Sequence, residues 1–305
     1  MKILVIFTGG TIGSSLSDGW ISTDSSTRYK IIDTYRQNHG DDVTFVTRSP
    51  YSILSENLSA QTLSALVNEV TAALNEDFDG IIVTYGTDTL QFSAAALAYA
   101  TGNDTVPIVL VSSNYPLDDP RANGNANFRA AVSFIKNACG RGVFISYKNA
   151  GNAVMFHNAL EALGHLESDD AVFSMHGNAY AVETADGIQI TGKALPCDKL
   201  EAKFAEDSRI LVAELHPANG YSYSLENCRA VILRPYHSGT LNTASPAFTA
   251  FCERAIKMNI PVYVVNVPDG AAYASSKAFD DLGITPLFNE TFASAYVRLW
   301  MQLSE

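Results

Sequence analysis

Short apolar runs alternate along the chain with longer stretches in which apolar residues recur every three or four positions. The runs have no polar interruption, which is typical of strands buried on both faces of a parallel sheet. In the first half of the chain, strands are predicted at residues 2–7, 42–47, 80–84, 107–112 and 142–147. Helices are predicted at residues 58–75, 89–100 and 124–139, with Ser59 as the N-cap of the first. The alternation predicts an α/β fold.

The pattern changes near residue 171. Residues 171–192 alternate between apolar and polar and carry Asp186-Gly187 between two short β-like runs, which predicts a hairpin. Residues 192–208 are polar and contain Pro196, as expected of a linker. Beyond it, strands are predicted at residues 209–215, 230–233 and 262–265, and helices at residues 245–259, at 276–282 and from about 291 onward.

These elements predict two parallel-sheet domains of the Rossmann-like or flavodoxin-like kind. The first domain is expected at residues 1–191, with the hairpin late in it, and the second at residues 209–305. Residues 192–208 would join them. Within the first domain, the loop at residues 149–170 is rich in Ala and Leu between positions 159 and 163, which gives it helical character.

Charge excludes several classes of partner. The 305 residues include 32 Asp and Glu against 20 Lys and Arg, a net charge of −12, which repels nucleic-acid phosphates and offers no polybasic patch to an anionic membrane. No apolar run approaches the ~20 residues that span a bilayer. The first run ends in Gly9-Gly10 with no cleavage site of a secretory signal, so a cytoplasmic protein is expected.

Candidate chemistry lies just after the strands, because ligands of open parallel sheets bind beyond the carboxyl ends of the strands. The first strand is followed by Thr-Gly-Gly-Thr-Ile-Gly at residues 8–13, where the glycines let the backbone approach a ligand closely. The third is followed by Tyr-Gly-Thr-Asp-Thr at residues 85–89. Neither segment is a GxGxxG motif or a P-loop.

Two interpretations of the second segment stay open. Asp88 could be a helix N-cap supported by Thr87. Alternatively, the Thr87 hydroxyl could act as a nucleophile or donor while Asp88 binds an ammonium group. The loop after the fourth strand, residues 112–123, offers the same choice, because Asn123 could simply cap the next helix.

Taken together, the motifs at residues 8–13 and 80–89 resemble the two signature motifs of the bacterial-type L-asparaginase family. Ser55-Glu56 stands where that family places a substrate-binding Ser before the first helix, and residues 107–116 and 283–287 are also similar. The resemblance covers essentially the whole chain. It implies hydrolysis of the side-chain amide of asparagine to aspartate and ammonia, with no cofactor and no metal. It also implies a homodimer or homotetramer.

The resemblance assigns roles residue by residue. Thr11 matches the nucleophile, and Thr87 and Asp88 match the second Thr and its neighbouring carboxylate. Ser55 would bind the α-carboxylate of the substrate and Asp88 its α-amino group. The same loops place four further residues against the substrate: Gly10, Glu56, Gly86 and Ser113. A Thr hydroxyl needs a base to become nucleophilic, and N–H groups of a Gly-rich turn can stabilise an oxyanion.

The sequence departs from the family at two positions. Tyr85 stands where the family has His, and its phenol is expected to hold a hydrogen bond there. The family also has a Lys that hydrogen-bonds the second Thr and relays its proton, about nine residues before a Phe. If Phe173 is that Phe, the position of the Lys is Gly164. No Lys or Arg occurs in residues 149–191. Three residues are candidates to replace the Lys: Lys148, His157 and His165.

Two further functions therefore stay open beside the asparaginase reaction. The pocket could hydrolyse a different small amide, or the chain could be a binding protein for amino acids without activity. The retained Thr11, Thr87 and Asp88 argue against the second of these. His216 and His237, in loops of the second domain, are too far apart in the sequence to predict a metal site.

Overall fold

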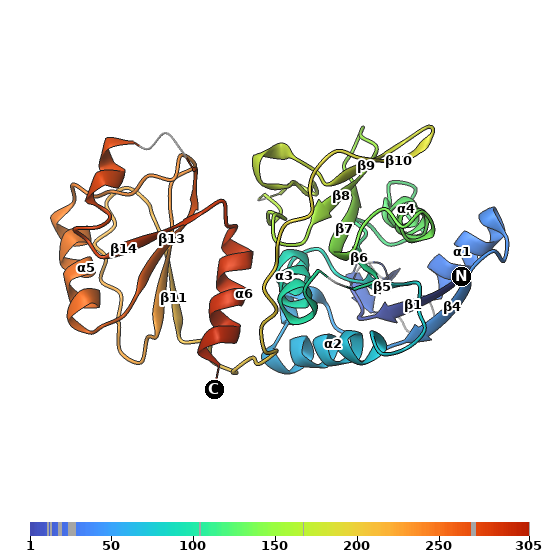
Figure 1. Cartoon of the computed structure of the whole chain (residues 1–305), viewed down its shortest axis with the longest axis horizontal. Helices are drawn as coiled ribbons and strands as arrows, with labels where there is room; N and C mark the ends of the chain where they lie inside the picture. The colour runs from blue at the N-terminus through green and yellow to red at the C-terminus, as the bar shows by residue number, and fades with distance from the viewer. Residues whose placement is uncertain are drawn as a thin grey trace. The chain divides into compact units, whose positions relative to one another are not determined.

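The computed structural model describes residues 1–10, 12, 14–17, 20–23, 29–103, 105–166, 168–269 and 273–304. The chain divides into two compact units, Met1–Phe204 and Ala205–Glu305 (Figure 1). The linker expected at residues 192–208 runs across this division. Both units have an α/β architecture, which confirms the predicted fold class.

An eight-stranded sheet forms the centre of the first unit, in the order β10-β9-β8-β7-β6-β5-β1-β4. Its first five strands along the chain are parallel: β1 (Lys2–Phe7), β4 (Thr44–Arg48), β5 (Gly80–Thr84), β6 (Pro107–Val111) and β7 (Gly142–Lys148). An antiparallel arm continues it: β8 (Val154–Asn158), β9 (Ala181–Thr184) and β10 (Gly187–Ile190). The hairpin expected around Asp186-Gly187 is therefore confirmed as β9–β10.

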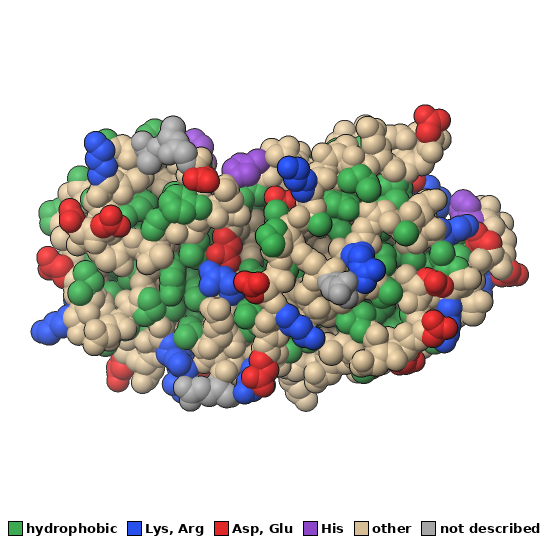
Figure 2. Space-filling model, viewed as in Figure 1, with side chains coloured by type: hydrophobic (Ala, Val, Ile, Leu, Met, Phe, Trp, Pro, Cys, Tyr) green, Lys and Arg blue, Asp and Glu red, His purple; other side chains and the backbone are tan. Residues whose placement is uncertain are grey.

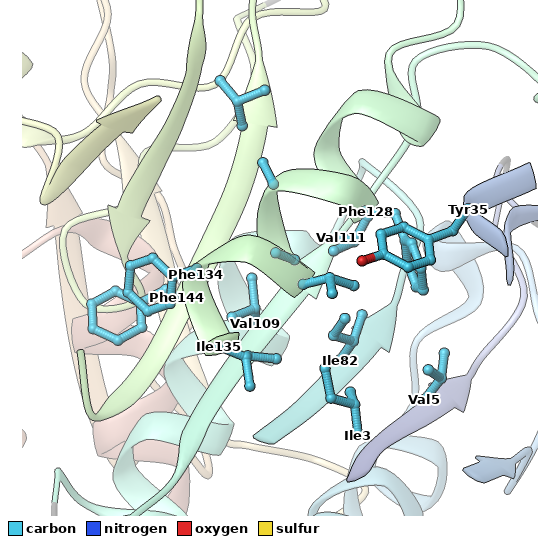
Figure 3. Packing of buried hydrophobic residues seen from close by; sticks show 14 of the residues in the cluster. Ile3, Val5, Tyr35, Ile82, Val109, Val111, Phe128, Phe134, Ile135 and Phe144 are labelled. Atoms are coloured by element: carbon cyan, nitrogen blue, oxygen red, sulfur yellow. The ribbon is translucent and has the colours of Figure 1, made fainter. Parts of the chain in front are cut away.

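Helices cover both faces of this sheet. Helices α1 (Lys30–His39) and α4 (Gly124–Lys136) pack on one face, and α2 (Ala60–Ala73) and α3 (Leu90–Thr101) lie together on the other (Figure 1). Side chains on alternate strand positions, such as Ile3, Val5 and Ile82, face α1 and α4 (Figure 3). Burying each of these aliphatic side chains contributes roughly 1.5–3 kcal/mol.

One crossover has the less common hand. The step from β1 to β4 and the step from β6 to β7 run in opposite directions across the sheet, yet their helices α1 and α4 share one face. The two connections must therefore be of opposite hand. The crossovers through α2 and α3 run in the direction opposite to the α1 crossover but lie on the other face, so all three have the same hand. Because crossovers between parallel strands are nearly always right-handed, β6–α4–β7 is the left-handed one.

Local sequence signals explain where the helices begin. The Ser59 hydroxyl accepts a hydrogen bond from the Thr62 backbone N–H at 3.2 Å, and the Thr62 hydroxyl accepts one from the Ser59 N–H at 2.9 Å. This capping box confirms Ser59 as the N-cap of α2. The short helix η2 (Ser55–Asn57) comes just before it and carries Ser55.

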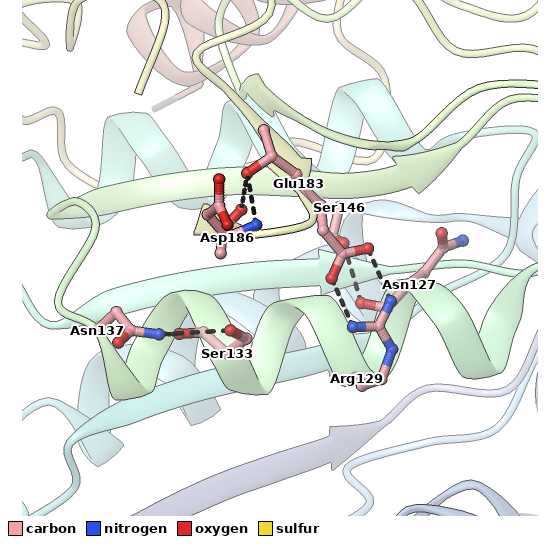
Figure 4. A network of polar contacts seen from close by, with 9 residues as sticks. Asn127, Arg129, Ser133, Asn137, Ser146, Glu183 and Asp186 are labelled. Atoms are coloured by element: carbon pink, nitrogen blue, oxygen red, sulfur yellow. Dashed lines mark hydrogen bonds and ion pairs between the residues drawn. The ribbon is translucent and has the colours of Figure 1, made fainter. Parts of the chain in front are cut away.

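An ion pair joins α4 to the antiparallel arm. The Arg129 guanidinium donates two hydrogen bonds to the Glu183 carboxylate, one of them at 2.7 Å (Figure 4). Nearby, the buried Ser146 hydroxyl donates to the Asn127 carbonyl at 2.9 Å. These contacts fix α4 against β7 and β9 on the face opposite α2 and α3.

The second unit has a four-stranded parallel sheet in the order β11-β12-β13-β14. Its elements are β11 (Ile210–Glu214), β12 (Ala230–Arg234), α5 (Pro246–Lys257), β13 (Val262–Val267), η4 (Ala274–Ala278), β14 (Ile284–Phe288) and α6 (Phe292–Leu303). A core around Phe248, Phe251 and Leu233 lies on one face of the sheet, and α6 packs on the other.

Several predicted elements are wrong or missing. Residues 159–163 are not helical: they follow strand β8 in a turn, because the Asn158 side chain accepts a hydrogen bond from the Leu160 N–H at 3.1 Å. The helix expected at residues 276–282 is only the short helix η4. The sequence patterns also missed α1, β8, β14 and the hairpin of β2 (Ser14–Ser17) with β3 (Trp20–Thr23).

The surface carries charges of both signs. Acidic and basic side chains are interspersed with hydrophobic ones on the face shown in Figure 2. Among the described residues, no helix combines the length and the apolar character needed to cross a bilayer.

Candidate functional site

The strand order puts a topological reversal point between β1 and β5. The chain steps from β1 to β4 on one side and then returns across β1 to β5 on the other. Loops that follow strands diverge at such a reversal point, which leaves room for a ligand at the carboxyl edge. The loops after β1, β4 and β5 meet here, and they carry most of the predicted site residues.

The loop after β1 is fixed to the loop after β4 by its backbone. Gly9 and Ile53 form a parallel bridge, and the Gly10 N–H donates to the Ile53 carbonyl at 2.9 Å. Gly9 and Gly10 have φ of +100° and +73°, a region that side chains with a Cβ disfavour. Thr11 itself lies outside the described residues.

The loops after β1 and β5 touch backbone to backbone. A Cβ on Gly10 would lie 2.5 Å from the Gly86 nitrogen and 2.6 Å from its Cα. A Cβ on Gly86 would in turn lie 2.6 Å from the Ser55 Cβ. Glycine at both positions is therefore required for the three loops to approach one another.

Ser55 and Asp88 form the polar centre of this cluster. The Ser55 hydroxyl donates to Asp88 Oδ2 at 3.2 Å and accepts from the Asp88 N–H at 3.2 Å. The Thr89 hydroxyl donates to the Ser55 carbonyl at 2.9 Å, which holds the two loops together. Ser55 is buried, whereas Asp88 is exposed and free to face a ligand.

Asp88 is not the N-cap of α3. The cap position belongs to Thr89, whose side chain makes no capping hydrogen bond. The Asp88 carboxylate is turned toward Ser55 instead. Thr87 is half-buried beside it, and its hydroxyl makes no hydrogen bond to any part of the chain that the structure describes. The capping interpretation of this segment is therefore wrong.

Tyr85 holds hydrogen bonds where the family resemblance placed a His. Its phenol accepts a bond from the Ser93 hydroxyl at 2.6 Å and lies 3.4 Å from the Thr89 hydroxyl. The expected role of the phenol is thus confirmed. Burial raises the pKa of Tyr85 and that of its neighbour Tyr51, so both phenols are neutral at pH 7.

The two other predicted substrate residues lie differently. Glu56 follows Ser55 and is exposed. Ser113 is fully buried, and its hydroxyl donates to the Tyr115 carbonyl at 2.6 Å and accepts from the Gly124 N–H at 3.2 Å. The structure therefore gives Ser113 contacts within its own loop and none with the Ser55–Asp88 pair.

Asn123 does not cap α4 with its side chain. Its amide oxygen accepts from the Asn114 N–H at 3.0 Å, and the Asn114 amide oxygen accepts from the Asn123 N–H at 3.1 Å. The Asn123 amide nitrogen also donates to the Lys148 carbonyl at 2.9 Å. Asn123 thus stands at the N-cap position of α4, as the capping interpretation expected, but its side chain connects the loop after β6 to the end of β7 instead of making a capping hydrogen bond.

The three candidate replacements for the relay Lys occupy different environments. Lys148 is exposed at the end of β7. His157 is 2% exposed, its Nδ1 pairs with the Ser174 hydroxyl at 2.8 Å, and burial lowers its pKa to about 4. His165 is half-buried, and the charge of Asp88 acts on it. His165 is thus the candidate whose environment includes a predicted site residue.

A pair of hydrogen bonds closes the loop that carries His165. The Asn149 amide nitrogen donates to the Val172 carbonyl, and the Asn149 amide oxygen accepts from the Val172 N–H, both at 2.9 Å. Both residues are buried. Asn149 therefore fixes the two ends of the loop against each other.

We expect Asn149→Ala to lower the free energy of unfolding by about 2–3 kcal/mol, because it leaves a buried N–H and a buried carbonyl unpaired. Urea denaturation followed by circular dichroism would measure the change. Asn152→Ala is the matched control, since Asn152 is exposed in the same turn. Equal stability of the two variants would contradict the role given to Asn149.

Gln91 was not predicted to belong to the site. It is nearly buried in the first turn of α3, and its amide donates to the Asp88 carbonyl at 3.5 Å. A long polar side chain in an otherwise Ala-rich helix is the sequence signal that could have identified it. Among the described residues, no group of His, Cys, Asp and Glu could hold a metal ion.

Comparisons with known proteins give a consistent result. The sequence model of the family described as "Asparaginase, N-terminal" matches residues 2–181. The L-asparaginase of Thermococcus kodakarensis is 29% identical over 148 residues, 48% of this chain and 44% of that protein. A glutamyl-tRNA(Gln) amidotransferase subunit of Methanosarcina mazei is 34% identical over 138 residues, 44% of this chain and 32% of that protein. The alignments thus span less than half the length of these relatives.

Solved structures match over the whole chain. The thermostable L-asparaginase from Thermococcus kodakarensis superposes with a TM-score of 0.77 at 19% identity, covering 100% of this chain and 93% of that one. The probable cytoplasmic L-asparaginase from Campylobacter jejuni gives a TM-score of 0.79 at 18% identity, with 99% and 94% covered. These structures share the two-unit fold.

Proposed function

Since the chain belongs to the asparaginase family, we propose that it hydrolyses the side-chain amide of L-asparagine, or of a closely related amino acid, to a carboxylate and ammonia. The observation that carries the proposal is the Ser55–Asp88 pair. It lies at the carboxyl edge of the sheet, where the backbones of Gly10 and Gly86 are in contact. This edge is the expected ligand position in an open parallel sheet.

Substrate recognition follows from the chemistry of this pair. An amino acid presents an α-ammonium and an α-carboxylate. The exposed Asp88 carboxylate can accept charge-assisted hydrogen bonds from the ammonium. The Ser55 hydroxyl, released from Asp88 by the bound ammonium, can then donate to the carboxylate. The two ends of the pair thus match the two charges of a zwitterion.

The reacting amide would then lie toward the Gly-rich loop. We assign the nucleophile to Thr11, whose hydroxyl would attack the amide carbon to give an acyl-enzyme and release ammonia. The Gly10 N–H already donates to Ile53, so other N–H groups of the Gly-rich loop and of the turn at Gly86 would stabilise the oxyanion. Water then hydrolyses the ester and restores the hydroxyl. We further propose that the chain acts as a homodimer or homotetramer.

Glutamine is the second candidate substrate. The amidotransferase relative from Methanosarcina mazei is the more similar in sequence of the two relatives compared above, at 34% identity. Its name identifies it as part of a glutamyl-tRNA(Gln) amidotransferase. Glutamine has one more methylene than asparagine, so the depth of the pocket beyond Ser55 and Asp88 would discriminate between them.

A coupled assay of ammonia release over asparagine, glutamine and several β-amides tests the proposal. Turnover of asparagine or glutamine is the expected result. Turnover of other amides alone would favour a hydrolase of a different small amide. Binding of asparagine by calorimetry without any turnover would favour an amino-acid-binding protein and would overturn the proposed activity.

Ser55→Ala is expected to raise the KM for the amino acid about 10- to 100-fold with a smaller effect on kcat, because a hydrogen bond to a charged group contributes ~1.5–3 kcal/mol. Steady-state kinetics by ammonia release would measure both constants. Ser52→Ala is the matched control, since Ser52 is exposed in the same loop. A KM unchanged by Ser55→Ala would remove Ser55 from the binding site.

A further inference from the structure

Backbone hydrogen bonds hold the segment that carries His165, and this segment lies near the start of helix α3. The backbone bonds between Leu163 N–H and the Phe173 carbonyl (2.9 Å) and between Met175 N–H and the Glu161 carbonyl (2.8 Å) make a short antiparallel clip. This clip fixes the direction of the segment just before His165.

The same segment packs on the start of helix α3. A Cβ on Gly164 would lie 3.1 Å from the Gln91 amide nitrogen, and that amide donates to the Asp88 carbonyl. Gly164 therefore allows a close approach to the turn at residues 87–88. The Asp88 carboxylate in turn acts on the charge of His165.

The His165 imidazole is buried at both ring nitrogens. Neither nitrogen has a side-chain hydrogen-bond partner in the described part of the chain, and the backbone of Asp169 and Ala171 lies beside the ring. The ring packs edge-on against Tyr147, with ring centroids 5.8 Å apart. The Tyr147 phenol donates a hydrogen bond to the Asp170 carbonyl at 2.7 Å, so it is not a partner of the imidazole. A half-buried imidazole without a side-chain partner is a reason to look for a functional one.

We propose, on the basis of the proposed function, that His165 is the base that receives the proton released at Thr87 when the amide is attacked. Thr87 is half-buried and precedes Asp88, whose carbonyl accepts from the Gln91 amide. Gly164, the residue before His165, closely approaches that amide. His165 thereby fills the role left vacant by the missing Lys. It acts through Thr87 and is a positioning residue for the proton.

The nucleophile, Thr87, His165 and water together account for every proton that moves in the reaction. As the nucleophile oxygen bonds to the amide carbon, its proton passes through Thr87 to the neutral imidazole. When the C–N bond breaks, the imidazolium returns this proton to the leaving nitrogen, which departs as ammonia. In the second half, water gives one proton to the imidazole and its oxygen to the acyl carbon, and the proton restores the hydroxyl.

The surroundings keep the imidazole neutral near pH 7. Burial lowers the pKa of His165, and the charges of Asp170 and Asp88, together with the backbone of Asp169 and Ala171, oppose that shift only in part. A pKa below the ordinary ~6.5 leaves the base unprotonated at neutral pH. The activity should therefore be level around pH 7 and should fall as the pH drops through the lowered pKa.

The test compares His165→Asn with the matched control His176→Asn, since His176 is an exposed histidine at the end of the same clip. We expect His165→Asn to lower kcat about 10²-fold, a typical loss for a general base, with KM nearly unchanged. The acid limb of the pH profile should disappear. His176→Asn should keep the wild-type kcat and profile.

Chemical rescue separates a base from a structural residue. His165→Ala should regain part of its kcat when free imidazole is added, and the regained activity should follow the titration of imidazole. An unchanged acid limb in His165→Asn, or no rescue of a folded His165→Ala, would overturn this inference while leaving the amidohydrolase function in place. Absence of any turnover by the wild-type protein would overturn both.

Discussion

Thr11→Ala is expected to lower ammonia release about 10⁴-fold or more. The variant loses the atom that would bond to the amide carbon, and with it the proposed acyl-enzyme route. The hydrogen bonds between Ser55 and Asp88 join two other loops, so amino-acid binding should persist. Single-turnover assays and calorimetry with the product amino acid would measure the two effects separately.

Thr11→Ser provides the matched control, because it keeps a hydroxyl and loses only a methyl group. We expect it to retain measurable turnover. Activity of Thr11→Ala within tenfold of the wild type would assign the attack to another group, and Thr87 would be the next candidate.

Gly10→Ala is expected to reduce activity by more than 10²-fold and to destabilise the first unit by about 3 kcal/mol or more. The new Cβ would meet the Gly86 backbone at 2.5 Å, so no flexible side chain can move aside. The loops after β1 and β5 would have to separate by about 1 Å, a displacement that costs catalysis heavily. Ammonia release and thermal unfolding would measure both losses.

Gly40→Ala separates steric overlap from backbone strain. Gly40 has φ of +76°, close to the +73° of Gly10, but a Cβ there would have no atom within 4 Å. This variant should lose only about 1 kcal/mol, the usual cost of a left-handed residue gaining a Cβ. Equal losses in both variants would show that strain, and not the contact with Gly86, makes Gly10 necessary.

The parallel strands could be predicted because a strand that is buried on both faces appears in the sequence as an uninterrupted apolar run. All five residues of β5 are buried, and its predicted bounds are those of the structure. Strand β8 was missed because His157 and Asn158 interrupt its apolar pattern, and among the described residues His157 is paired only through Ser174, 17 positions away. Helix α1 buries just Ile31, Ile32 and Tyr35, which is too few for a clear helical period.

The candidate site could be predicted in its residue types but not in its contacts. The motif placed Asp88 in the site, yet its bond to Ser55 depends on two loops separated by 33 positions. The local signals for Asp88 and Asn123 favoured capping, because Asp and Asn at helix starts usually do so. The Asp88 side chain accepts a hydrogen bond from Ser55 instead, and the Asn123 side chain accepts one from the Asn114 N–H.

The contact between Gly10 and Gly86 has a consequence for how this scaffold can diverge. These two loops follow β1 and β5, which are paired neighbours in the sheet, so their spacing comes from the strand ladder itself. The segment with His165 is attached through a separate clip at the periphery. If His165 is the proton acceptor, as proposed, that acceptor can differ between relatives without altering the strand ladder that sets the contact between Gly10 and Gly86.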